Sequence, residues 1–308
     1  MTLYHILGRC AKAQLPPVEL SELRREVEHA SMLDGLVEQA EAQRMAPLFY
    51  SHCRAAGAEL PQEIRLPLQG LVLRHTAAAA VRIAVLKDLL ANTQSAGIPL
   101  ILLKGAATAT LAYSDPALRP MRDLDILSRP QDVPGLYGIL EQMGFVTPPS
   151  LSPLVISDKH LPHTELQREG LTVTLEVHTR LFDSLWRPQQ PAVSELFQRA
   201  RPFEIEGQPA LSLSLEDLLW HTYQHLVIEE IRLIGIADLI SISQRYVDEI
   251  NWTLIRQHYP DLLAALSVIH FLAPLPPEVI RRSGILLGRP PTGIGQDWAG
   301  WPRRALGE

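Results

Sequence analysis

Apolar and polar positions follow a helical spacing in the first part of this chain. From Leu20 to about Cys53 the apolar residues recur on one helical face with charged residues between them. The same spacing returns from Leu68 to Ala96, and Gly97 then stands where a helix C-cap is expected. The region before Gly97 is therefore predicted to be all-helical.

The pattern changes to strands and helices in the middle of the chain. Short apolar or alternating runs predict strands at Ile98–Leu103, Asp123–Leu127 and Leu171–His178. Helical spacing predicts helices at Ala106–Tyr113 and Asp132–Met143. This order of elements predicts an α+β fold with a small mixed sheet.

Helical patterning returns near the C-terminal end. Pro188, Pro191, Pro202 and Pro209 predict a loose connection, after which Ser214 and Asp217 have the spacing of a capping box for a helix to about Val227. Helical spacing then continues to about Phe271, and the segment from Pro274 is predicted to be extended and to pack back through Trp298 and Trp301. The predicted regions are an N-terminal helical region (1–81), a core (82–206), a C-terminal helical region (207–273) and a tail (274–308).

Charge narrows the class of partner. The 308 residues include 28 Lys and Arg against 34 Asp and Glu, for a net charge of −6. Proteins that neutralise a nucleic-acid backbone use clustered basic residues, so nucleic acid is not the expected partner. A small molecule or a protein is therefore the favoured partner, and it would be the acceptor if the protein transfers a group.

The sequence contains few features that indicate a cellular compartment. Cys10 and Cys53 lack metal-ligand spacing and are too few for a disulfide framework, so we expect reduced thiols. No basic and apolar leader is visible at the start of the chain, and the longest uncharged stretch, Leu262–Pro277, is interrupted by prolines and too short to span a bilayer. These features predict a cytoplasmic protein without a membrane span.

Three acidic residues in the centre suggest one site. Asp123 and Asp125 lie two apart on a predicted strand, so both carboxylates project from the same face, and Glu176 lies on a later strand. Carboxylate oxygens suit Mg²⁺, or Mn²⁺ in its place, and substrate phosphates commonly complete the coordination. A metal-dependent reaction of a nucleotide is the chemistry that this set predicts.

A glycine turn precedes the acids. Gly105 ends the first predicted strand, where the backbone can approach a phosphate and the following helix offers unpaired N–H groups, including that of Ala106. Lys104 can add a charge contact to a phosphate, although a solvated lysine at a strand end is an equal alternative.

Together these residues resemble the nucleotidyltransferases of the DNA polymerase β superfamily, and in particular a large bacterial branch of it. The resemblance rests on Leu103-Lys104-Gly105, on the run from Arg119 to Leu127, on Gly144-Phe145 and on Leu175-Glu176-Val177-His178, with further matches near both ends of the chain. It implies that Asp123, Asp125 and Glu176 are catalytic metal ligands and that Gly105 belongs to the phosphate-binding turn. Many superfamily members have Ser where this chain has Ala106, and Lys104 or Thr108 would have to substitute for that hydroxyl.

Other polar residues have two interpretations each. Arg119 and Arg122 flank the acid pair and are predicted to bind nucleotide, with a solvated Arg122 as the alternative. His178, His163 and His225 are candidates for orienting the acceptor, with an ordinary structural hydrogen bond as the alternative. His221 and His225 have the spacing of a zinc pair, but no third ligand is evident, so zinc is not favoured.

The sequence thus predicts an enzyme. It would transfer a nucleoside monophosphate from an NTP, with ATP expected, to an unidentified small-molecule or protein acceptor, and release pyrophosphate. The alternative is a catalytically degenerate nucleotide-binding or protein-interaction module on the same fold, which Ala106 favours and the three acids oppose. A polymerase-like or tRNA-tailing enzyme is opposed by the acidic net charge and by the lack of a basic run in the sequence.

Overall fold

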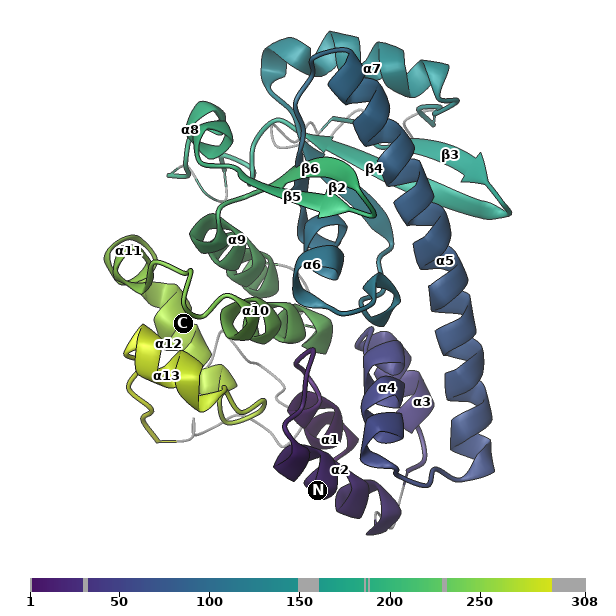
Figure 1. Cartoon of the computed structure of the whole chain (residues 1–308), viewed down its shortest axis with the longest axis vertical. Coiled ribbons are helices and arrows are strands. Elements are labelled where there is room, and N and C mark those ends of the chain that lie inside the picture. The colour runs from purple at the N-terminus through teal and green to yellow at the C-terminus, as the bar shows by residue number, and fades with distance from the viewer. Residues whose placement is uncertain are drawn as a thin grey trace. The chain divides into compact units, whose positions relative to one another are not determined.

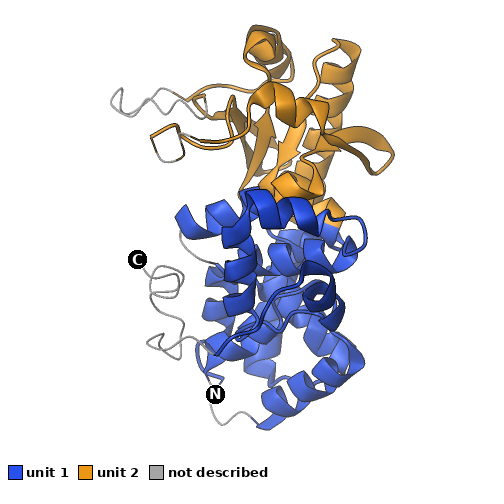
Figure 2. Ribbon diagram, turned by 90° about the vertical axis from the view of Figure 1, so that its left-hand side faces the viewer, with its two compact units in different colours: residues 1–76, 112–120, 219–308 blue, residues 77–111, 121–218 orange. Residues whose placement is uncertain are grey.

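The chain folds into two compact units, each assembled from separate stretches of sequence (Figure 2). The computed structural model describes residues 2–29, 33–148, 161–185, 187, 189–228 and 232–289. Unit 1 comprises residues 1–76, 112–120 and 219–308, and unit 2 comprises residues 77–111 and 121–218. Trp298 and Trp301, for which the sequence predicts packing against the body, lie outside the described residues.

The described residues form helices and a single sheet (Figure 1). The helices are α1 (Leu3–Arg9), α2 (Pro17–His29), α3 (Leu36–Ala42), α4 (Ala46–Ala56), α5 (Gln62–Ser95), α6 (Lys104–Ala112), α7 (Val133–Gln142), α8 (Val193–Gln198), α9 (Leu215–Ile228), α10 (Leu233–Arg245), α11 (Trp252–His258), α12 (Pro260–Ile269) and α13 (Pro277–Ser283), with short 3₁₀ turns η1 (Pro116–Leu118) and η2 (Pro130–Asp132). The strands are β1 (Ile101–Leu103), β2 (Asp123–Leu127), β3 (Thr164–Arg168), β4 (Leu171–His178), β5 (Arg201–Ile205) and β6 (Gln208–Ser212).

All six strands belong to unit 2 and form one mixed sheet in the order β3-β4-β2-β1-β6-β5. The central strands β1 and β2 are antiparallel, whereas β2 pairs with β4 in parallel. The side chains of Leu124 and Ile126 are buried, as the alternating pattern of β2 requires for the core face of a sheet. The other face of β2 is therefore the one that carries Asp123 and Asp125.

Helix α5 contacts both edges of this sheet. Lys87 of α5 forms an ion pair with Glu206 in the turn between β5 and β6, and Asp88 pairs with Arg168 of the opposite edge strand β3. Its apolar side chains, among them Leu86 and Leu89, are buried. The helix ends at Ser95, and Gly97 follows with a φ of +70°, the left-handed conformation that the sequence predicts at this C-terminus.

Unit 1 is helical, and α10 is its most buried helix. Nearly every side chain from Leu233 to Ser243 is buried, including the carboxylate of Asp238. A helix that buries side chains on all sides belongs in a core, and α10 is such a helix. Helices α4 and α13 of the same unit also bury apolar residues, such as Phe49 and Val279. No described helix is long and apolar enough to cross a membrane.

Two expectations from the sequence were wrong. The connection with several prolines, expected to be loose, contains α8 and the β5–β6 hairpin. Pro202 is tolerated because β5 is an edge strand, and Pro209 precedes the part of β6 that pairs with β1. The segment after Pro274, expected to be extended, contains α13, which begins at Pro277 and ends at a left-handed Gly284.

Candidate active site

Three neighbouring strands bring the candidate residues together. The antiparallel pairing of β1 and β2 sets Leu103 opposite Asp125, so Lys104 follows beside that carboxylate. The parallel pairing of β2 and β4 sets Asp125 opposite Glu176. Since paired residues of neighbouring strands project from the same face, the two carboxylates lie side by side.

Asp125 is the buried centre of this group. Its side chain is almost fully excluded from solvent, and the same oxygen, Oδ1, is 2.9 Å from the Lys104 ammonium and 2.8 Å from His178 Nε2. Burial by itself would raise the pKa of this carboxyl group, but the Lys104 charge and the His178 hydrogen bond hold the pKa well below its usual range. Asp125 is therefore a carboxylate throughout the physiological pH range.

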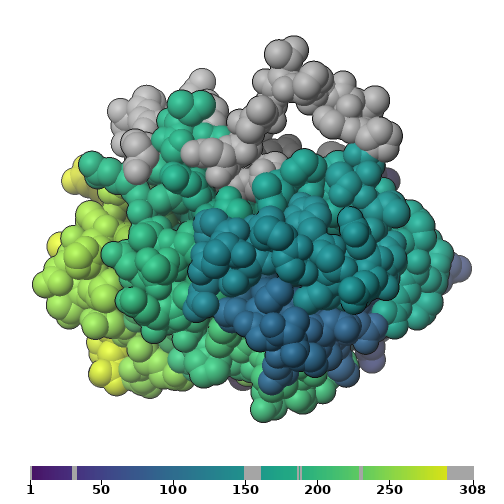
Figure 3. Space-filling view, turned by 90° about the horizontal axis from the view of Figure 1, so that it is seen from above, coloured from purple at the N-terminus to yellow at the C-terminus, as the bar shows by residue number. Residues whose placement is uncertain are grey.

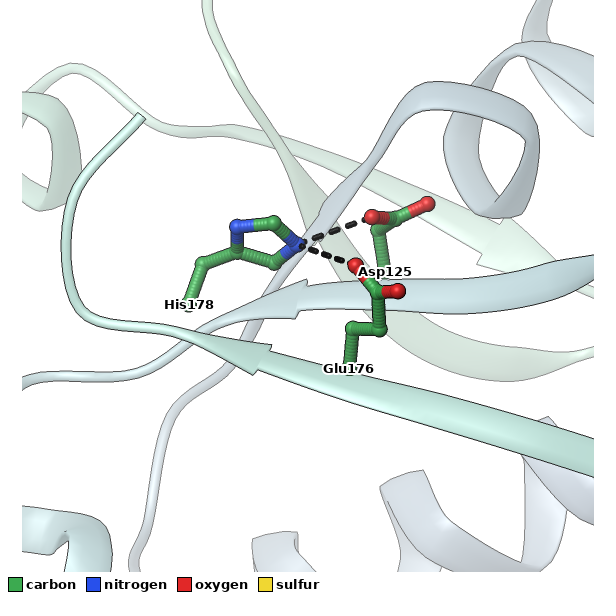
Figure 4. Close-up of side chains that lie close together, drawn as sticks. All are labelled: Asp125, Glu176 and His178. Carbon is green, nitrogen blue, oxygen red and sulfur yellow. Dashed lines mark hydrogen bonds and ion pairs between the residues drawn. The ribbon is translucent and has the colours of Figure 1, made fainter. Parts of the chain in front are cut away.

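Asp125, Glu176 and His178 form a cluster with the character of a metal site (Figure 4). One ligand atom from each of them lies within 4.8 Å of the others. His178 Nε2 faces both carboxylates and is 3.7 Å from Glu176 Oε2. His178 is completely buried, whereas Glu176 is partly exposed and can reach a substrate. Within the described part of the chain, no other group of three or more possible ligands comes together in this way.

Asp123 lies outside this cluster. It begins β2, pairs in register with Thr174 and is partly exposed. The carboxylates of Asp123 and Asp125 share a face of the strand, as the sequence predicts, but the compact group consists of Asp125, Glu176 and His178. His178 is the member of the group for which the sequence predicted two alternative roles, orienting the acceptor or making a structural hydrogen bond.

Lys104 connects β1 to α6 in a strained conformation. Its φ of +44° lies in the left-handed region, which a residue with a Cβ adopts at a cost. Strain of this kind persists only where the surrounding structure holds it, and it is often found at functional sites. Gly105 and Ala106 follow as buried residues in the first turn of α6, and Thr108 is buried further along that helix with no described hydrogen-bond partner for its hydroxyl.

Arg82 of α5 is a residue near the site that the sequence analysis missed. Its guanidinium is mostly buried, donates long hydrogen bonds of 3.4 Å to the carbonyl of Ala78 and 3.3 Å to that of Arg122, and experiences the charge of Asp123. Burial lowers its pKa, and the Asp123 carboxylate acts in the opposite direction. The sequence signal that could have identified Arg82 is its position between apolar residues of a predicted helix.

Arg119 is engaged elsewhere. In unit 1 its guanidinium lies 2.7 Å from Asp238 Oδ2, and the hydroxyl of Tyr113 donates to Asp238 Oδ1 over 2.8 Å. All three side chains are buried, so each polar group compensates the burial of another. Arg122, the other predicted phosphate ligand, is exposed immediately before Asp123.

The other candidate histidines are not members of the cluster. His163 is half exposed and 3.5 Å from Glu165 Oε1 on β3. His225 and His221 belong to unit 1, where their Nε2 atoms are 3.1 Å apart on α9. The group of three possible metal ligands found among the described residues does not include this pair.

Sequence comparison decides the family. The family of uncharacterised nucleotidyltransferases matches residues 29–272, which is most of the chain. The chain belongs to this family. The match includes β1, β2 and β4 with all three members of the cluster, and it confirms the predicted family and α+β fold class. This member of the nucleotidyltransferase family is accordingly an enzyme that transfers nucleotidyl groups.

Solved nucleotidyltransferase structures are similar to part of this family member. An antigenic nucleotidyltransferase-like protein from Paracoccidioides brasiliensis is 21% identical over 65% of this chain and 96% of its own, with a TM-score of 0.39. ANT(2'')-Ia in complex with adenylyl-2''-tobramycin is 16% identical over 58% of this chain and 98% of its own, with a TM-score of 0.41. No curated protein matches the chain. The family match, rather than these structures, carries the identification.

The buried charge of Asp125 predicts a stability that depends on pH. An aspartate of the unfolded chain titrates at about pH 3.9, and the folded pKa of Asp125 is lower. This carboxylate therefore stabilises the folded protein above about pH 4, and the contribution is lost as the pH falls further. Relative to Asp125→Asn, the wild-type protein should lose about 1 kcal/mol of unfolding free energy between pH 7 and pH 3.

Urea titrations of both proteins at several pH values in this range, with EDTA present, measure that loss. An unfolding free-energy difference between wild type and Asp125→Asn that does not change with pH would contradict the lowered pKa.

The buried pair in unit 1 predicts a structural role for Arg119. Asp238→Ala leaves the Arg119 guanidinium buried without a carboxylate partner, which should lower the unfolding free energy by about 3–5 kcal/mol. The double variant Arg119→Met with Asp238→Leu should lose less, because no uncompensated charge remains. Urea unfolding of the three proteins tests this ranking, and a loss below about 1 kcal/mol in Asp238→Ala would contradict it.

Proposed function

We propose that this enzyme transfers a nucleoside monophosphate from an NTP to an acceptor hydroxyl or amine in a reaction that depends on Mg²⁺, or on Mn²⁺ in its place. ATP is the donor that we expect, and the acceptor is a small molecule or a protein. The observation that carries the proposal is the register that sets Asp125 beside Glu176, next to the Lys104 turn. Family membership supports the transfer of a nucleotidyl group.

The donor set fits a hard divalent cation. Two carboxylates whose oxygens lie within 4.8 Å of one another suit Mg²⁺, and the imidazole of His178 is also acceptable to Mn²⁺. We propose Asp125 and Glu176 as ligands, with Asp123 joining them from the start of β2. A bound cation would supply charge stabilisation to the phosphates at the reacting centre.

Each protein residue then has a proposed task. The Lys104 ammonium lies 2.9 Å from an oxygen of Asp125. Because the lysine side chain is long, its ammonium can turn from this carboxylate to the phosphates of a bound nucleotide. The backbone of Gly105 and Ala106 and the exposed Arg122 complete the proposed nucleotide site. His178 holds Asp125 in one orientation through its Nε2 hydrogen bond.

Proton transfer is assigned to Glu176. Its carboxylate is partly exposed, whereas Asp125 is buried and held at low pKa, so Glu176 is the acid that an acceptor can approach. As the acceptor oxygen or nitrogen bonds to the α-phosphorus, the bond from that phosphorus to the bridging oxygen breaks and pyrophosphate leaves. The proton of the acceptor passes to Glu176, which is general-base work for a positioned carboxylate.

Nucleotide binding tests the proposal without knowledge of the acceptor. Calorimetric titration of each NTP with Mg²⁺ should show selective binding by the wild-type protein and at least tenfold weaker binding by Asp125→Asn, because a carboxylate ligand of the metal is removed. Asp88→Asn is the matched control, since it makes the same change in an exposed acid of unit 2 and should leave NTP binding unchanged.

Two results would contradict the proposal. One is equal NTP binding by Asp125→Asn and the wild-type protein. The other is the absence of binding of every NTP by a folded wild-type protein, which would favour a degenerate protein-interaction module. If binding is found, release of pyrophosphate with candidate acceptors and its loss in Glu176→Gln distinguish catalysis from binding alone.

A further inference from the structure

Two cavities of unit 2 share one lining residue, Arg129, which lies two residues beyond the end of β2. One has a volume of about 420 Å³ and lies between the end of α5, residues 97–100 before β1, and the start of β6. The other, of about 540 Å³, lies between η2 and α8. Arg129 lines both. In Figure 3 the end of α5, in blue, lies beside the β5–β6 hairpin, in green, and the pair Gln94–Gln208 joins these two walls.

The first cavity has mostly apolar walls. Leu90 of α5, Ile98 and Pro99 of the following segment and Leu211 of β6 are among its lining residues, and Thr93 and Gln94 add two polar groups. A volume of this size is in the range of cavities that hold small molecules. Its walls suit an apolar body such as a flat ring.

Arg129 supplies a positive charge to both cavities. Its guanidinium carbon lies 4.7 Å above the ring centroid of Phe197 on α8, a distance typical of cation–π contact. No carboxylate of the described residues pairs with this guanidinium, and Arg129 is the single charged residue among the described residues that line either cavity. Its fork of N–H donors is therefore open to an anion.

The charge count favours a monoanion. One guanidinium matches one carboxylate in a bidentate pair, whereas the several charges of a phosphate ester or a triphosphate need additional cations. The cavities also stand away from the acid cluster: Arg129 follows Asp125 by four residues of extended chain, roughly 13 Å at the rise of a strand. Asp125, Glu176 and His178 line neither cavity, so a small ligand bound there does not contact the acid cluster.

We infer that the two cavities at Arg129 form a second ligand site, for a small carboxylic acid with a flat apolar body. The carboxylate pairs with the Arg129 guanidinium, the apolar body occupies the cavity beside α5, and Ser194 and Gln198 offer hydrogen bonds on the α8 side. The site is independent of the proposed nucleotidyl transfer at Asp125.

A matched pair of probes tests this site in the full-length protein. We would titrate 2-naphthoate and its neutral analogue 2-naphthamide into the wild-type protein by calorimetry. Naphthoate should bind at least tenfold more tightly than the amide, because only the acid pairs with a guanidinium. Naphthoate binding should weaken at least tenfold in Arg129→Met and less in Phe197→Leu, where the guanidinium loses the ring that holds it.

Controls separate this site from the acid cluster. Arg65→Met removes an exposed arginine of α5 in unit 1, and Asp125→Asn alters the acid cluster; both should bind naphthoate as the wild type does. Circular dichroism establishes that each variant is folded. Binding of naphthoate by Arg129→Met as tight as by the wild type, equal binding of the amide, loss of binding in Asp125→Asn, or no binding of naphthoate to the wild type at millimolar concentration would overturn the inference.

Discussion

The negative charge of Asp125 inside the sheet is the constraint on which this site depends. A carboxylate removed from water is costly unless positive charge and hydrogen bonds replace its hydration. Lys104 and His178 meet that requirement by approaching the same oxygen from the two sides of β2, Lys104 just after β1 and His178 at the end of β4. The register of β1 and β4 against β2 places the Lys104 ammonium and the His178 imidazole where they compensate the buried charge of Asp125.

The strain at Lys104 belongs to the same arrangement. A left-handed φ lets the chain leave β1 and enter α6 within one residue, with the side chain of that residue directed at Asp125. A glycine would adopt this conformation more easily but would carry no ammonium. Gly105, the residue that sequence patterns emphasise, instead has an ordinary φ within the first turn of the helix.

Two ion pairs with a buried aspartate differ in how far their surroundings are exposed. Arg119 and Asp238, with Tyr113, lie among the apolar side chains of unit 1, with every member buried. Lys104 and Asp125 adjoin Glu176, which is partly exposed, so that group can meet a ligand. Arg119 and Arg122 look alike in the sequence because both precede the acids, and only the fold separates a buried structural cation from an exposed one.

The sequence by itself determined the central elements and the family. The apolar run before Lys104 and the alternation over Asp123–Leu127 and Leu171–His178 predicted β1, β2 and β4, because period and burial are local properties of a strand. It could not determine that β5 and β6 pair despite their prolines, that His178 rather than Asp123 completes the compact cluster, or that Arg119 meets Asp238. Those outcomes depend on strand order, register and contacts between residues far apart in the chain, and only the tertiary structure decides them.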